Sequence, residues 1–250
     1  TGFCASATAL QTASLTASLH PNRLGSPTTI EVAFKIRSIP PEDQMPLIDV
    51  GLQLPEEMGI ATSGLGLANC QVPKLEELGP KGCPVNALMG RGIATAEIPF
   101  AGEVISESAR IELFSAPVKA NRLSLLVYVD ARSPVFAQLV FPATVLPASS
   151  PFGETIDTSV PLVPTLPGAP DVAVTLFHMT IGATSRGDGH FLYERVSHGK
   201  RMMYSPKGLL LPPRCPKGGF PFQAHFVFSD QTTATARTSV PCPPHKDRTA

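Results

Sequence analysis

The sequence contains no tryptophan and little charge, and both shortages exclude classes of function. Only 16% of its 250 residues are charged, and the formal net charge is zero, whereas soluble domains usually carry roughly 25% charged residues. A chain without a positive excess gives no electrostatic case for binding nucleic acid or an anionic membrane surface. The lack of tryptophan also weakens the case for a sugar-binding surface, because such surfaces usually stack aromatic rings on sugars.

Sequence motifs of common enzymes and metal sites are missing as well. The nucleophile elbow G-x-S-x-G, the metalloprotease pattern H-E-x-x-H and both phosphate-loop patterns are absent. No C-x-x-C pair occurs and no histidine has zinc-finger spacing, which argues against structural zinc. The longest apolar run is Leu125–Val129, whereas a membrane-spanning helix needs about 20 apolar residues. The sequence therefore predicts no catalytic residues, no metal or other cofactor and no membrane span.

Proline and glycine are plentiful, and the segments between them alternate with a period of two. The 27 prolines are about twice the usual share of roughly 5%, and with 20 glycines they predict many turns and few long helices. Between residues 220 and 228 the even positions are all Phe or Ala, and residues 28–37 alternate in the same way. This period is typical of strands with one buried face. Further strands are expected at residues 10–20, 48–54, 93–98, 104–114, 122–130, 135–145, 172–181 and 232–240.

These strands predict an all-β, antiparallel, sandwich-like fold with very little helix, built as one elaborated sandwich or two packed sandwiches. Residues 1–9 are expected to be a mobile N-terminus, and residues 10–146 a first β region. The proline-rich residues 147–170 indicate a linker or a crossover between sheets. Residues 171–250 form a second β region that ends in a hairpin turning near Asp230.

The five cysteines indicate two disulfide bonds and one cysteine left over. Cys70 with Cys83, and Cys215 with Cys242, form two sequence-local pairs flanked by glycine and proline. Disulfides in both pairs would close a loop over the sheet and clasp the last hairpin, each contributing roughly 3 kcal/mol. The alternative is that these cysteines are reduced and buried as small apolar residues. With the other four cysteines in two pairs, Cys4 is left over and is expected to be unpaired or bonded to another molecule.

The segment from residue 184 to 206 contains the candidate binding residues. A basic and aromatic patch that could stack on sugar rings or contact an acidic polymer consists of Arg186, Phe191, Tyr193, Arg195, Lys200 and Tyr204. If the segment were helical, His190, Glu194 and His198 would share one face and a metal site would be conceivable. Gly189 and Gly199 favour a polar hairpin instead. Elsewhere, we expect His178 to be a buried, hydrogen-bonded histidine and His225 to be a surface one.

Three motifs are distinctive: Leu65-Gly-Leu-Ala-Asn-Cys70, Gly79-Pro-Lys-Gly-Cys-Pro84 with Gly90-x-Gly92, and Pro213-Arg-Cys-Pro-Lys-Gly-Gly-Phe-Pro-Phe222 with Val240-Pro-Cys242-Pro. Together they resemble a group of uncharacterised exported proteins from soil actinobacteria, and the resemblance covers most of the chain from Leu15 onward. The resemblance supports secretion and both cysteine pairs but implies no activity. The chain also begins without methionine, as expected if an export signal was removed.

The function expected from the sequence is an exported, non-enzymatic structural or interaction protein of the cell envelope, outside the cell or on its surface. Its partner would be an envelope polymer or another surface protein. One alternative is a carbohydrate- or polymer-binding module that uses residues 186–204. The other is a metal-dependent hydrolase built on the two histidines and the glutamate of that segment.

Overall fold

A computed structural model describes residues 11–39, 44–60, 68–100, 103–133, 136–164, 171–182, 193–197, 200–204 and 209–244. The expected mobile N-terminus and Cys4 lie outside these residues. Antiparallel strands dominate the fold, and each strand expected from the sequence overlaps an observed one. The long strands are β1 (Gln11–His20), β2 (Pro27–Ser38), β3 (Leu47–Pro55), β5 (Leu88–Phe100), β6 (Glu103–Lys119), β7 (Arg122–Ala131), β8 (Ala137–Pro147), β9 (Phe152–Ser159), β10 (Ala173–Ile181), β14 (Phe220–Phe228) and β15 (Thr233–Val240).

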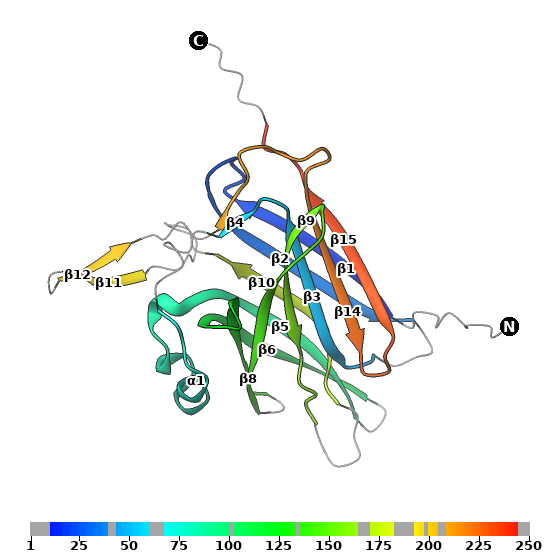
Figure 1. The fold of residues 1–250 in the computed structure, drawn as a ribbon. Helices are drawn as coiled ribbons and strands as arrows, with labels where there is room; N and C mark the ends of the chain where they lie inside the picture. Colours follow the sequence, from blue (N-terminus) through cyan, green and yellow to red (C-terminus); the bar gives the residue numbers. More distant parts are fainter. Residues whose placement is uncertain are drawn as a thin grey trace, which may run out of the picture.

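These strands form one continuous sheet that curls into a nearly closed barrel (Figure 1). The strand order is β15-β14-β3-β9-β8-β7-β6-β5-β10-β2, and β1 pairs with the outer side of β2. β1 also lies beside β15, which brings the two ends of the sheet together. The expected sandwich is therefore wrong in its architecture, although the all-β class is confirmed. When one sheet curls until its edges meet, the edge strands are protected from pairing with other chains. Two separate sheets would leave their edge strands exposed.

The barrel combines strands from both parts of the chain. β14, near the C-terminus, pairs with β3, near the N-terminus, so the first and second β regions share one sheet. The proline-rich residues 147–170 contain β9, which pairs with β3 on one side and β8 on the other. Only the stretch after β9 connects distant strands, because four strands separate β9 from β10 in the sheet. The linker expected from the proline content is thus partly a central strand.

The last hairpin follows its sequence pattern closely. All four phenylalanines of β14 are fully buried, whereas His225 on the opposite face is exposed. The turn is fixed by Asp230, whose Oδ1 accepts a hydrogen bond of 3.0 Å from the Thr232 amide, and by Gln231, which has a φ of 67°. A disulfide joins Cys215 to Cys242 at the open end, with Cα atoms 5.8 Å apart. The expected clasp is confirmed.

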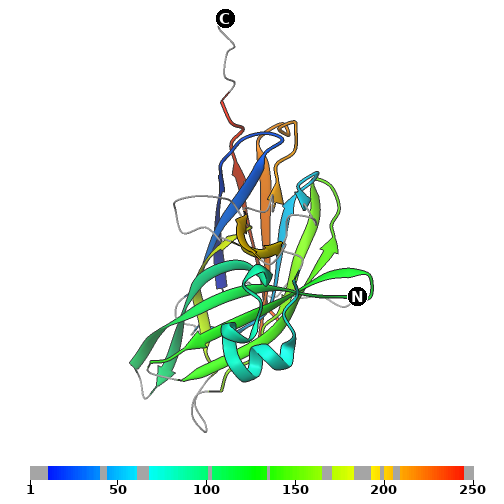
Figure 2. The same cartoon turned by 90° about the vertical axis from the view of Figure 1, so that its left-hand side faces the viewer.

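The other disulfide holds a small helical layer on the outside of the barrel (Figure 2). Cys70 and Cys83 are bonded, with Cα atoms 4.9 Å apart, and enclose α1 (Val72–Leu78) and the 3-10 turn η1 (Gly79–Gly82). Leu75 of α1 is fully buried against the outer faces of β6 and β7, together with the second 3-10 turn η2 (Val85–Ala87). No helix in the described part of the chain is long and apolar enough to cross a membrane.

The remaining strands are short. β4 (Gly59–Ile60) and β13 (Leu209–Leu210) extend the sheet beyond β2, and β11 (Tyr193–Ser197) and β12 (Lys200–Tyr204) form a separate hairpin. This hairpin projects away from the barrel (Figure 1).

Candidate functional site: an apolar cavity inside the barrel

The hairpin expected in the 184–206 segment is confirmed, and its register is known. Tyr193 pairs with Tyr204 and Ser197 with Lys200, so four of the six candidate binding positions belong to one hairpin. Arg186 and Phe191 lie outside the described residues, as do His190 and His198. Side-chain positions in β11 and β12 are not among the described features, so binding by this patch stays a prediction.

The helix required by the metal-site alternative does not form around Glu194, because this residue lies in β11 and pairs with Met203. A strand directs alternate residues to one face, so the four-residue spacing no longer has the helical meaning that suggested the site. Within the described ranges, no cluster of three or more His, Cys, Asp or Glu residues could hold a metal ion.

The interior of the barrel is packed unevenly, and the sequence of the strands explains why. On β2 and β14 the inward positions carry large side chains, and those of Ile30, Ile36, Phe222 and Phe226 are at least 99% buried. On β5 to β8 many inward positions carry alanine, at residues 94, 96, 109, 131, 137 and 143. Alanine extends only one carbon from the backbone, so these strands leave space that the opposite wall does not fill.

The space left by the alanines is a partly enclosed cavity of about 190 Å³. Apart from the alanines, its wall consists mostly of valine, leucine, isoleucine, phenylalanine and methionine side chains. Among the described residues, the polar ones that line it are Glu107 on β6 and Thr158 on β9. Its chemistry suits a mostly apolar molecule rather than a sugar or a free inorganic ion.

The chain between β9 and β10 also contributes to the wall of the cavity. Pro161, Val163 and Val172 line the cavity, and the Val172 amide donates a hydrogen bond of 3.1 Å to the Val163 carbonyl. The proline-rich stretch therefore has a role that composition alone does not suggest. Pro161 and Val163 of this stretch help to enclose the cavity.

The cavity is a feature that sequence reasoning does not single out. Inward alanines look like ordinary small residues in a strand, and their effect appears only when the opposite wall is known. Glu107 gives a stronger signal, because it interrupts the inward series Ile105, Ala109, Ile111 and Leu113 on β6. A charged residue at a core-facing position lowers the stability of the fold, so its presence there indicates a function.

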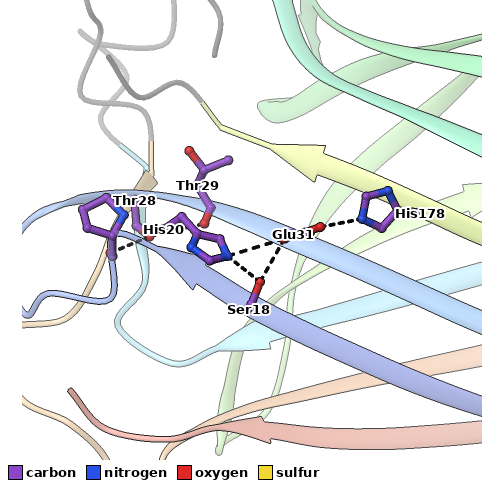
Figure 3. A network of polar contacts seen from close by, with 7 residues as sticks. Ser18, His20, Thr28, Thr29, Glu31 and His178 are labelled. Carbon is purple, nitrogen blue, oxygen red and sulfur yellow. Dashed lines mark hydrogen bonds and ion pairs between the residues drawn. The ribbon is translucent and has the colours of Figure 1, made fainter. Parts of the chain in front are cut away.

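A cluster of polar side chains lies on the outer face of β1, β2 and β10 (Figure 3). Glu31 is its centre: Oε1 lies 2.7 Å from His178 Nε2, and Oε2 accepts a hydrogen bond of 3.3 Å from Ser18 Oγ. Oε2 is also 3.4 Å from His20 Nε2. The hydrogen bond with His178 is the main cause that lowers the pKa of Glu31, although burial opposes it. His178 is hydrogen-bonded as expected, but the expectation that it is buried is wrong, since its side chain is 41% exposed.

This cluster does not have the arrangement of a serine hydrolase. Ser18 Oγ lies 2.8 Å from His20 Nε2, and Glu31 approaches the same ring nitrogen. In a catalytic triad the acid holds the opposite ring nitrogen, which leaves the first one free to accept the serine proton. Ser18 instead donates to Glu31, so the cluster links neighbouring strands.

Replacing Glu31 with glutamine is expected to lower stability only where the carboxylate is ionised. The folded state lowers the pKa of this group, so its contribution is present above the unfolded pKa and is lost as the pH falls through the folded pKa. Because the groups are exposed, we expect a loss of less than about 1 kcal/mol near pH 7 and almost none near pH 3. Urea unfolding at both pH values measures the difference, with the exposed Glu103→Gln as control. An equal loss at both pH values would contradict the assignment.

Two further carboxyl groups on β9 have perturbed acidity but do not line the cavity. Burial raises the pKa of Asp157, and the nearby charge of Asp49 on β3 raises it further. Burial also raises the pKa of Glu154. Asp49 in turn accepts a hydrogen bond of 3.1 Å from Ser159 Oγ. These contacts connect adjacent strands and do not form a pocket with the apolar interior.

Comparisons of the chain with protein-family models, with curated proteins and with solved structures found no match.

Proposed function

We propose that the protein is an exported, non-enzymatic binding protein that holds a small apolar molecule inside its barrel. The observation that carries this proposal is the cavity lined by inward-facing alanines of β5 to β8. Barrel interiors that side chains do not fill commonly hold one small ligand. The proposal makes the expected interaction protein more specific, because it names the interior as the binding surface.

The size and lining of the cavity support this function. An apolar cavity of roughly 150 Å³ is large enough to bind benzene, and the volume here is about 190 Å³. Binding an apolar molecule removes its surface from water, which contributes roughly 25 cal/mol per Å² of apolar area. The surrounding wall is preformed by paired strands, so little ordering of the protein opposes this gain.

The two disulfides fit an extracellular location, because such bonds persist in oxidising compartments. The resemblance of the cysteine motifs to exported proteins supports the same location. A protein outside the cell that carries an apolar molecule would keep it away from water during transport or storage. No catalytic step is part of this proposal.

Filling the cavity is expected to abolish binding without unfolding the protein. Ala109 lines the cavity on β6, and Ala109→Leu adds three carbon atoms to its interior. The apolar dye N-phenyl-1-naphthylamine is expected to become more fluorescent when it binds the wild-type protein. We expect this increase in fluorescence to be at least tenfold smaller with the Ala109→Leu variant. The unfolding temperature should change little, because the new side chain occupies existing space.

The matched control is Ser108→Leu, which adds a leucine to the neighbouring, exposed position of the same strand. It should bind the dye as the wild-type protein does. Equal dye binding by the Ala109→Leu variant and the wild-type protein would contradict binding in the cavity. An absence of dye binding to the wild-type protein would contradict it as well.

A further inference from the structure

The feature that carries a further inference is the acidic side chain inside the apolar cavity. Glu107 lies on the inner face of β6, lines the cavity and is only 6% exposed. Its Oε1 atom is buried and accepts no hydrogen bond from the described residues. A buried acceptor without a donor is unfavourable, because the bonds that it makes with water in the unfolded chain are not replaced.

A purely structural role does not explain this position. Inward-pointing charges can protect the edge of a sheet from pairing with other chains, but β6 lies within the sheet, paired with β5 through Glu107 itself and with β7 from Ala109 onward. The cross-strand partner of Glu107 on β5 is Ala96, which has no polar side-chain group. No ion pair to Glu107 is formed within the described ranges. A donor or a positive charge supplied by a ligand would satisfy the group.

We propose that the ligand is an apolar molecule with a single protonated amine as its head group, and that Glu107 binds this head. The inference rests on the proposed function, because it assigns the chemistry of the molecule held in the same cavity. An ammonium group donates hydrogen bonds and supplies the opposite charge, so it satisfies a buried carboxylate better than a hydroxyl group does. A carboxylic acid ligand would place two acidic groups together, and a ligand without a head would leave Oε1 unsatisfied.

The order of residues along β6 gives the orientation of the ligand. Glu107 is followed on the inner face by Ala109, Ile111 and Leu113, all of which line the cavity. Six residues of strand span about 20 Å, so the apolar wall continues well beyond the carboxyl group. The amine head would lie at Glu107, and the apolar body would extend along β6 toward Leu113.

Competition between three ligands of equal tail length tests this assignment. Octylamine, octanol and octanoate share one apolar tail and differ only in their head groups. Each is titrated into the wild-type protein carrying bound N-phenyl-1-naphthylamine, and displacement of the dye is measured. The titrations are repeated with Glu107→Gln, which keeps the size of the side chain. The control is Glu97→Gln, which removes the same charge from the outward-facing position beside Ala96 on β5.

Octylamine is expected to displace the dye from the wild-type protein at a concentration at least about tenfold lower than octanol, with octanoate the weakest. This preference should fall to about twofold or less in Glu107→Gln and remain in Glu97→Gln, while the dye itself binds all three proteins. Equal displacement by the three ligands, or a preference that survives in Glu107→Gln, overturns the head-group assignment and leaves apolar binding intact. Failure of the dye to bind the wild-type protein overturns the proposed function and this inference together. The ranking in the wild-type protein tests the inference even if the Glu107 variant folds poorly.

Discussion

Replacing Phe226 with alanine is expected to lower the free energy of unfolding by about 3–5 kcal/mol. The side chain is fully buried on β14, and its ring forms a T-shaped contact with Phe34, with centroids 4.9 Å apart. Phe34 in turn stacks on Phe177 of β10, with centroids 4.7 Å apart. Removing the ring therefore leaves a hole where three strands from distant parts of the chain meet. Urea unfolding of the purified variant measures the loss.

The control for this prediction is the neighbouring position on the same strand. His225 is exposed and contacts Thr235 Oγ1 at 3.2 Å, so His225→Ala should change stability by no more than about 0.5 kcal/mol. If both variants lose the same small amount, the β14 phenylalanines do not form the core of the barrel and the packing described above is wrong.

Removing the disulfide of the last hairpin is expected to lower the free energy of unfolding by about 3–4 kcal/mol in the chain-entropy model. Cys215 and Cys242 are 27 residues apart, so the bond restricts a long stretch of the unfolded chain. The double variant Cys215→Ser with Cys242→Ser should unfold at a clearly lower urea concentration than the wild-type protein.

The second cysteine pair serves as the comparison. Cys70 and Cys83 are only 13 residues apart, so removing this pair should cost somewhat less, about 3 kcal/mol. Thiol-reactive labelling of the unfolded wild-type protein without reductant should leave both pairs unlabelled. Labelling of either pair, or equal stability of the wild-type protein and the Cys215 double variant, would contradict the described clasp.

The sequence predicts the individual strands better than it predicts the closure of the barrel. Residues 220–228 and 28–37 alternate clearly, and both form strands because period-two alternation is a property of neighbouring residues. β9 is harder to predict, because Pro147 and Pro151 precede it and its residues include Glu154 and Asp157. The barrel depends on β1 lying beside β15, a contact between opposite ends of the chain that no local pattern reveals.

The candidate site was less accessible to sequence reasoning than the fold. The basic and aromatic residues of the 186–204 segment attract attention because they are chemically distinctive, and their binding role stays a prediction. The alanines of β5 to β8 are chemically plain, yet they determine where the barrel is empty. A cavity is a difference between the volumes of facing walls, so it requires the pairing of strands that are distant in sequence. Glu107 was recognisable only as an exception to an inward-facing apolar series.

Alanine methyl groups can report directly on whether the alanine-lined interior binds an apolar molecule. Protein labelled with carbon-13 at its alanine methyl groups would be titrated with N-phenyl-1-naphthylamine and followed by NMR. We expect the methyl resonances of Ala96, Ala109 and Ala137 to shift to saturation with one dye bound per chain. The methyl groups of Ala87 and Ala116, which are buried outside the barrel near α1, should stay unchanged. Dye binding that shifts only these outer methyl groups, or none of the inner ones, would mean that the interior of the barrel is not the binding site.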